Sequence, residues 1–239
     1  EMKDANEYLK TGQQEKFVRT WWNAKTYTPA GIINLADLGD SLYDEVYHET
    51  CHYPWDKLNE KTYGMRTGEL VTFTSGAGMG KSSVMRELMY HIMGSTQDNI
   101  GLLALEESTR NTAFNIMSVE ADARLYIKEI RDQYTPEQLK DWEDKTIGSR
   151  RFFAFDHFGS TSNDEILDRV RCMAKALDCK WVFLDHLSIL VSGQEDFGDE
   201  RKSIDILMTK LRSLVEETGI ALMLVSHLRR PSGDRGHEE

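Results

Sequence analysis

Three glycines, a lysine and three serines follow one another closely between residues 74 and 83, in a pattern that suits phosphate binding. Gly76, Gly78 and Gly80 allow the backbone to curl so that successive N–H groups point inward, and a helix that begins there adds its N-terminal dipole. Lys81 is then within reach of terminal phosphates, and Ser82 of a Mg²⁺ ion. The stretch therefore predicts a site for a nucleotide polyphosphate.

The stretch follows the form GxxxxGK[ST] with one departure, since Ser75 stands where the first glycine is expected. We interpret it as a small-residue variant of the phosphate-binding P-loop. The alternative is a glycine-rich turn between a strand and a helix. The predicted nucleotide-binding residues are Ser75, Gly76, Ala77, Gly78, Met79, Gly80, Lys81, Ser82 and Ser83.

Carboxylates end two apolar runs further along the chain. Asp185 follows four apolar residues, in the form of a Walker B element that would hold Mg²⁺ beside Ser82; the alternative is an Asp that caps a helix. Glu106 and Glu107 end the run 100–105, where adjacent side chains point in different directions. We favour Glu106 as the base that activates the attacking water, with Glu107 as a cap for the next helix.

A histidine and three arginines follow the last apolar run. His227 is placed to contact the γ-phosphate or the water, although a structural histidine is the alternative. The loop beyond it carries the cluster Arg229, Arg230 and Arg235, which could grip a phosphodiester backbone; a solvated loop is the alternative. The two predicted contacts lie two residues apart, so hydrolysis could move the loop.

These side chains need a scaffold, and the chain alternates short apolar runs with helical patterns. Strands are predicted at 70–74, 100–105, 152–155, 181–185 and 220–226, with helices over 81–93, 109–131, 136–146, 163–177 and 201–217. This alternation is typical of an α/β fold with a mostly parallel sheet covered on both faces. Ligands bind such sheets at the carboxyl ends of the strands, where the candidate residues stand.

The chain divides by pattern into an arm, residues 1–54, and a nucleotide-hydrolysing α/β domain, residues 55–239. A helix over 34–53 with an apolar stripe is predicted to pack on another part of the molecule or on another subunit. It contains His48-Glu49-Thr50-Cys51-His52, which matches the zinc motif H-E-x-x-H. We reject a zinc site because no third ligand with a recognisable spacing accompanies the two histidines.

Composition limits the function classes. A formal charge of −11 over 239 residues argues against a protein that coats nucleic acid with its whole surface, but leaves room for a local basic loop. No apolar run approaches the roughly 20 residues of a membrane span, and the first residues, Glu1-Met2-Lys3-Asp4, lack the charged-then-apolar layout of a secretory signal. Three cysteines without a CxxC pair favour reduced thiols. We expect no membrane partner and a cytoplasmic location.

Four motifs occur together in order: the P-loop variant, Leu105-Glu106-Glu107-Ser108, Leu184-Asp185-His186 and Ser226-His227-Leu228. With them the chain resembles the helicase part of phage primase-helicases of the T-seven type, which are related to the mitochondrial Twinkle helicase and to the bacterial DnaB group. The resemblance implies a RecA-like core. It also implies a replicative DNA helicase that hydrolyses ATP or dTTP with Mg²⁺ while translocating on single-stranded DNA.

The resemblance carries roles to matching positions. Lys81 and Ser82 would bind phosphate and Mg²⁺, Glu106 would be the base, Asp185 the Walker B carboxylate and His227 the γ-phosphate sensor. The loop with Arg229, Arg230 and Arg235 would bind DNA.

The resemblance also implies an assembly. We expect a homo-hexameric ring in which the linker helix docks on a neighbouring subunit, with a replisome polymerase as a further partner, in the cytoplasm of a phage-infected bacterium. A primase domain is expected before residue 1, and an arginine finger on a strand beyond Glu239. Two alternatives remain open: a RecA-like recombinase or helicase loader that forms filaments, and a nucleotide-binding module without turnover.

Overall fold

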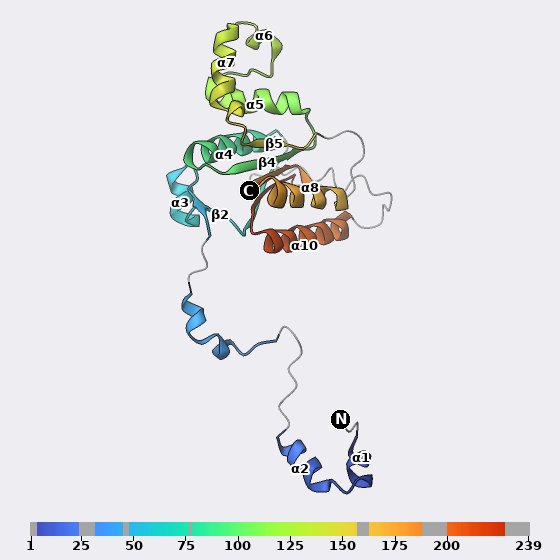
Figure 1. The fold of residues 1–239 in the computed structure, drawn as a ribbon. Coiled ribbons are helices and arrows are strands. Elements are labelled where there is room, and N and C mark those ends of the chain that lie inside the picture. The colour runs from blue at the N-terminus through green and yellow to red at the C-terminus, as the bar shows by residue number, and fades with distance from the viewer. Residues whose placement is uncertain are drawn as a thin grey trace, which may run out of the picture. The chain divides into compact units, whose positions relative to one another are not determined.

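The computed structural model describes residues 4–23, 32–44, 48–76, 78–156, 163–187 and 200–227 (Figure 1). The chain divides into two compact units, residues 1–47 and 48–239. Within the described ranges, no helix is both long enough and apolar enough to cross a bilayer.

The described part of the first unit contains three short helices: α1 (Ala5–Lys10), α2 (Gln14–Trp22) and the 3₁₀ helix η1 (Leu35–Tyr43). Asp4 caps α1 by accepting a hydrogen bond of 3.0 Å from the backbone N–H of Glu7. Phe17 lies between Tyr8 and Trp21, with ring centroids 5.6 and 6.2 Å apart, so α1 and α2 meet through aromatic rings.

The predicted helix over 34–53 is wrong. η1 ends at Tyr43, and Gly39 within it has φ 49° and ψ −130°, outside the helical region. Thr50 and Cys51 form β1, which pairs antiparallel with β2 (Met65–Arg66). The strand pairing removes His48 and His52 from a common helix, and with it the one-turn geometry on which the zinc motif depends.

The second unit is built on a five-stranded sheet in which every pairing is parallel. Its strands lie in the order β3-β7-β6-β4-β5. Their bounds are β3 Leu70–Ser75, β4 Asn99–Ala104, β5 Phe152–Ala154, β6 Cys179–Asp185 and β7 Ala221–His227. The predicted strands and the predicted mostly parallel sheet are confirmed.

Side chains alternate between the two faces of this sheet, as a strand requires. Trp181 and Phe183 of β6 pack in one core cluster with α4 (Lys81–Ser95). Val182 and Leu184 pack in the other cluster with α8 (Asn163–Ala176) and α10 (Glu200–Thr218). Figure 1 shows α8 and α10 side by side. A strand buried on both faces explains the continuous apolar run at 181–184.

The other helices among the described residues of this unit are α3 (Asp56–Thr62), α5 (Thr109–Ala121), α6 (Lys128–Arg131), α7 (Pro136–Lys145) and the short 3₁₀ helix η2 (Ile147–Ser149). The helical pattern predicted over 109–131 is divided between α5 and α6, because Asp122 has a left-handed conformation with φ 46° and ends α5. Thr135 begins α7 with a capping box, and Pro136 occupies its first turn. α5, α6 and α7 form a group beside α4 (Figure 1).

Candidate active site

The loop predicted to bind phosphate joins β3 to α4. Gly78 and Gly80 have φ values of 78° and 87°, a region that other residues rarely adopt. A Cβ atom at either position would meet nothing within 4 Å, so backbone conformation and not space requires glycine there. Gly80 is also the N-cap of α4 and offers no capping side chain, so the first N–H groups of the helix face the loop. Ala77 lies outside the described residues.

Lys81 begins α4 and is only 8% exposed. Its Nζ donates hydrogen bonds to the carbonyl oxygens of Gly76 at 2.7 Å and Ser75 at 2.9 Å, and it lies 3.3 Å from Ser75 Oγ. The ammonium group is therefore turned back over the start of the loop. Ser75, at the position of the missing glycine, supplies two of the three oxygens around it, and Met79 is exposed nearby in the loop.

Ser82 and Asp185 line one small cavity between α4, α5 and the ends of β4 and β6. Asp185 has the same strand parity as Trp181 and Phe183, so its side chain faces α4. A hydroxyl and a carboxylate are hard oxygen ligands, and Mg²⁺ is commonly held by one or two carboxylates together with waters and phosphates. Among described residues there is no cluster of three or more His, Cys, Asp or Glu able to hold a metal. The Ser82 hydroxyl and the Asp185 carboxylate fit Mg²⁺ bound together with a polyphosphate.

The two glutamates after β4 have different surroundings. The side chain of Glu106 is 61% exposed, and its Oε1 lies 3.5 Å from Nδ1 of the buried His186. Glu107 is 24% exposed and accepts hydrogen bonds from three side chains. Its predicted capping role is wrong, because Ser108 is the N-cap of α5 and accepts the hydrogen bond from Asn111 N–H.

His227 is the last residue of β7 and pairs with Ser75 of β3 in the backbone register. Since β7 lies between β3 and β6, the chain at His227 lies between the P-loop and the strand of Asp185. The His227 side chain is outside the described residues. The predicted DNA-binding residues Arg229, Arg230 and Arg235 also lie outside them.

Sequence reasoning missed the three side chains that donate hydrogen bonds to the Glu107 carboxylate. Arg86 lies in α4, and Thr112 and Asn115 lie in α5. The helical patterns covered both segments but did not reveal how the two helices pack together. Arg86 also lines a second cavity between α4 and α5, together with Ser83, Glu87, Asn115, Ser118, Val119, Asp122, Ala123, Arg124 and Tyr126. The one available signal was spacing: Arg86 follows Ser82 by four residues and so shares its helix face.

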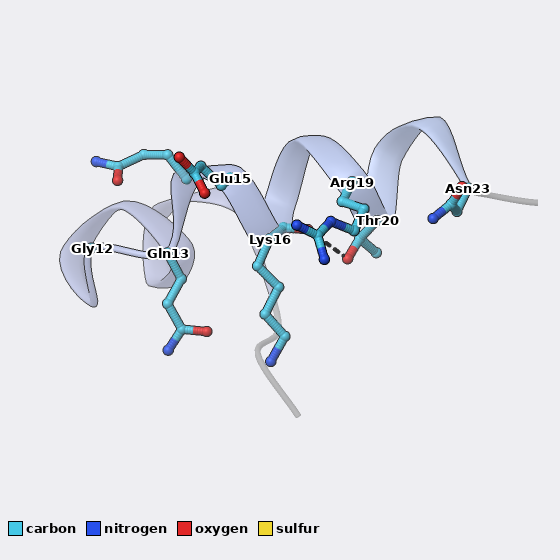
Figure 2. A pocket seen from close by; sticks show the side chains of 8 residues that line it. Gly12, Gln13, Glu15, Lys16, Arg19, Thr20 and Asn23 are labelled. Atoms are coloured by element: carbon cyan, nitrogen blue, oxygen red, sulfur yellow. Dashed lines mark hydrogen bonds between the residues drawn. The ribbon is translucent and has the colours of Figure 1, made fainter.

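A separate concave surface lies on the first unit, at the turn between α1 and α2 and along α2 (Figure 2). It is lined by Gly12, Gln13, Gln14, Glu15, Lys16, Arg19, Thr20 and Asn23. Thr20 Oγ1 donates to the carbonyl oxygen of Lys16 at 2.8 Å, a bond within the helix. No predicted site residue belongs to this surface.

Comparison with known proteins adds two sequence matches. Residues 52–239 match the family model of the DnaB-like helicase C-terminal domain. The DNA helicase/primase of Enterobacteria phage T3 is 33% identical over an alignment of 243 residues, which covers 99% of this chain and 43% of that protein. The chain thus spans less than half the length of this relative.

Solved structures share the fold. One ATPase domain of known structure matches with a TM-score of 0.63 at 18% identity, over 82% of this chain and 72% of that one. A DnaB-like replicative helicase, described with its interactions with primase, gives the same TM-score and identity over 95% of this chain and 57% of that one. A KaiC-like protein from Pyrococcus horikoshii OT3 has a TM-score of 0.53 at 19% identity, over 76% of this chain and 72% of that one. These likenesses confirm the predicted fold.

Proposed function

Because the chain belongs to the family of DnaB-like helicase C-terminal domains and has a RecA-like ATPase fold, we propose that it is the motor of a replicative DNA helicase. Hydrolysis of a nucleoside triphosphate would drive translocation on single-stranded DNA and unwinding of the duplex. The observation that carries this proposal is the convergence of the P-loop, Glu106 and Asp185 at the carboxyl edge of one parallel sheet. The similarity to a phage DNA helicase/primase supports it.

The loop from Ser75 to Ser83 is proposed to bind the polyphosphate of ATP or dTTP. Its curled backbone and the start of α4 offer N–H donors, which suit anionic oxygens. Lys81 Nζ now donates to the carbonyl oxygens of Ser75 and Gly76, and phosphate oxygens would take over these bonds. The buried ammonium group is thereby held close to its binding position before the nucleotide arrives.

Ser82 and Asp185 are proposed to hold Mg²⁺. The ion would neutralise charge on the β- and γ-phosphates as the bond between them breaks. Ser82 supplies a hydroxyl oxygen from the first turn of α4, and Asp185 supplies a carboxylate, directly or through water, from the end of β6. Both line one cavity, which supports a joint role.

Glu106 is proposed to accept a proton from the attacking water. The water oxygen forms a bond to the γ-phosphorus, the bond to the β–γ bridging oxygen breaks, and the proton moves to the Glu106 carboxylate. A base needs an accessible oxygen with spare acceptor capacity. The exposed Glu106 meets this requirement better than Glu107, whose oxygens already accept three hydrogen bonds.

His227 is proposed to report the γ-phosphate to a DNA-binding loop that carries Arg229, Arg230 and Arg235. The position of β7 between β3 and β6 supports this, because the backbone at His227 borders the P-loop. Loss of the phosphate would change the contact at His227, and two residues later the chain enters the arginine loop.

We also propose a homo-hexameric ring in which the 1–54 arm docks on a neighbouring subunit. Large apolar side chains of the arm support docking, since Trp21, Trp22, Leu35 and Tyr43 are 66, 79, 74 and 81% exposed. A replisome polymerase as a further partner and the cytoplasm of a phage-infected bacterium as the location belong to the same proposal.

The test is hydrolysis of ATP and dTTP by the complete protein, with and without single-stranded DNA. We expect DNA to stimulate hydrolysis and Lys81→Ala to reduce the rate about 10²-fold or more. Arg229→Ala combined with Arg235→Ala should weaken DNA binding and its salt dependence. Hydrolysis that ignores DNA, or micrographs that show open filaments instead of closed rings, would contradict the proposal.

A further inference from the structure

Glu107 is the meeting point of three hydrogen bonds from two helices. Arg86 Nη2 of α4 lies 3.2 Å from Oε2, and Asn115 Nδ2 of α5 donates to the same oxygen at 2.7 Å. Thr112 Oγ1 of α5 donates to Oε1 at 3.1 Å. The carboxylate thus ties the end of β4 to both helices.

The donors around Glu107 depend on it. Thr112 and Asn115 are 3 and 5% exposed, so their polar groups have little access to water. A buried donor that loses its acceptor destabilises the folded state by about 1–3 kcal/mol. Conformations of the turn that remove the Glu107 carboxylate from these donors are therefore strongly disfavoured. Glu107 is therefore fixed in place by its surroundings.

Glu106 and Glu107 are neighbours that face different elements. Glu107 contacts α4 and α5, whereas Glu106 lies beside His186 at the end of β6. The two residues are consecutive in the bend that follows β4, so fixing the Glu107 side chain restricts the backbone that carries Glu106. Arg86 follows Ser82 by one helical turn, and both line the cavity that includes Asp185.

From these contacts, and on the basis of the function proposed above, we propose that Glu107 is a positioning residue for hydrolysis. It clamps the turn that bears Glu106 to the P-loop helix, so that the base keeps a fixed distance from the phosphates held by Lys81 and Ser82. It touches neither the water nor the nucleotide. Attack geometry is sensitive to displacements of about 1 Å, so loosening the clamp should slow hydrolysis while leaving nucleotide binding nearly intact.

The chain offers a matched control. Tyr90, one turn further along α4, donates a hydrogen bond to Glu120 of α5. This contact also joins α4 to α5 but includes neither glutamate of the turn. Tyr90→Phe therefore measures how much the loss of a hydrogen bond between α4 and α5, away from the turn, changes kcat.

The experiment compares Glu107→Gln, Tyr90→Phe and wild type in the complete protein with single-stranded DNA. Glutamine keeps the shape of the side chain but directs an amide N–H₂ at donors. We expect kcat to fall about 10-fold or more in Glu107→Gln, with KM for the nucleotide within about twofold of wild type. Tyr90→Phe should retain the wild-type kcat.

A second pair keeps the test valid if Glu107→Gln fails to fold. Thr112→Val removes one donor to Glu107 at nearly constant volume, and Thr112→Ser retains the hydroxyl. We expect kcat to fall in the valine variant and to remain close to wild type in the serine variant.

Three results would overturn the inference. In the first, Glu107→Gln, or Thr112→Val in its place, hydrolyses like wild type. In the second, Tyr90→Phe slows hydrolysis as much as Glu107→Gln. In the third, Glu106→Gln remains active while Glu107→Gln does not, so that Glu107 is itself the base. Failure of the proposed function would look different, since wild type itself would then show no DNA-stimulated hydrolysis.

Discussion

Arg151 and Met93 are 58 residues apart in the chain and are joined by a hydrogen bond of 2.7 Å from the guanidinium Nη2 to the carbonyl oxygen. Arg151 Nη1 also donates to the carbonyl oxygen of Thr96 at 2.8 Å. The residue before β5 thus caps the C-terminal end of the P-loop helix. Since unpaired carbonyl groups and the negative end of the helix dipole both favour a cation there, this contact helps to hold α4 on the sheet.

Arg151→Ala should therefore lower the free energy of unfolding by about 1.5–3 kcal/mol, the usual range for hydrogen bonds to a charged group. The measurement is urea denaturation followed by circular dichroism. Arg150→Ala is the control, because it removes a neighbouring arginine with φ 60° whose side chain does not cap α4. Equal losses in the two variants would contradict the capping role.

Gly101 of β4 lies against the Met173 side chain of α8. A Cβ atom there would lie 2.7 Å from Met173 Sδ, so Gly101→Ala should destabilise the protein by about 1–3 kcal/mol through overpacking. Gly94→Ala is the control. No atom lies within 4 Å of a Cβ at position 94 in α4, and alanine should there add about 0.5–1 kcal/mol through helix propensity. Both changes can be measured by thermal unfolding, and a stable Gly101→Ala variant would refute the close approach.

Asp185→Asn should weaken the response of hydrolysis to Mg²⁺. The amide keeps the shape of the side chain but removes the charge that we assign to the ion, so we expect kcat to fall about 10²-fold or more. A titration with Mg²⁺ at saturating nucleotide measures the effect. Asp178→Asn, an exposed change at a carboxylate before β6, is the control. An unchanged Mg²⁺ response in Asp185→Asn would remove this residue from the metal site.

Burial raises the pKa of the Cys179 thiol to about 12, with a smaller contribution from the Asp178 carboxylate. An unfolded thiol has a pKa near 8.5, so the folded state holds this proton more tightly. The resulting stability is fully present below about pH 8.5 and is lost as the pH rises toward 12.

At pH 8 a maleimide should label the exposed Cys172 first and reach the buried Cys51 and Cys179 only in urea. Rapid labelling of Cys179 in the native protein, read by mass spectrometry of peptides, would contradict its burial.

The sequence alone determined the α/β fold, the five strands of the sheet and the P-loop. Those features depend on local signals: strands such as 181–184 are buried on both faces and read as apolar runs, and Gly78 and Gly80 adopt conformations that glycine favours. Asp185 could be placed at the end of a strand because it directly follows the apolar run 181–184. The helix predicted over 34–53 did not form as one element. The sequence has a helical spacing of apolar residues there, but the pairing of β1 with β2 overrides this local preference.

Only the tertiary structure decided which groups each glutamate after β4 contacts. Glu106 and Glu107 are the same residue type, side by side, and the sequence offers no basis for their contacts. The difference arises because α4 and α5 bring Arg86, Thr112 and Asn115 to Glu107, while the end of β6 brings His186 to Glu106. Such contacts depend on how helices pack across the sheet, and packing between distant segments leaves no periodic signal in the sequence.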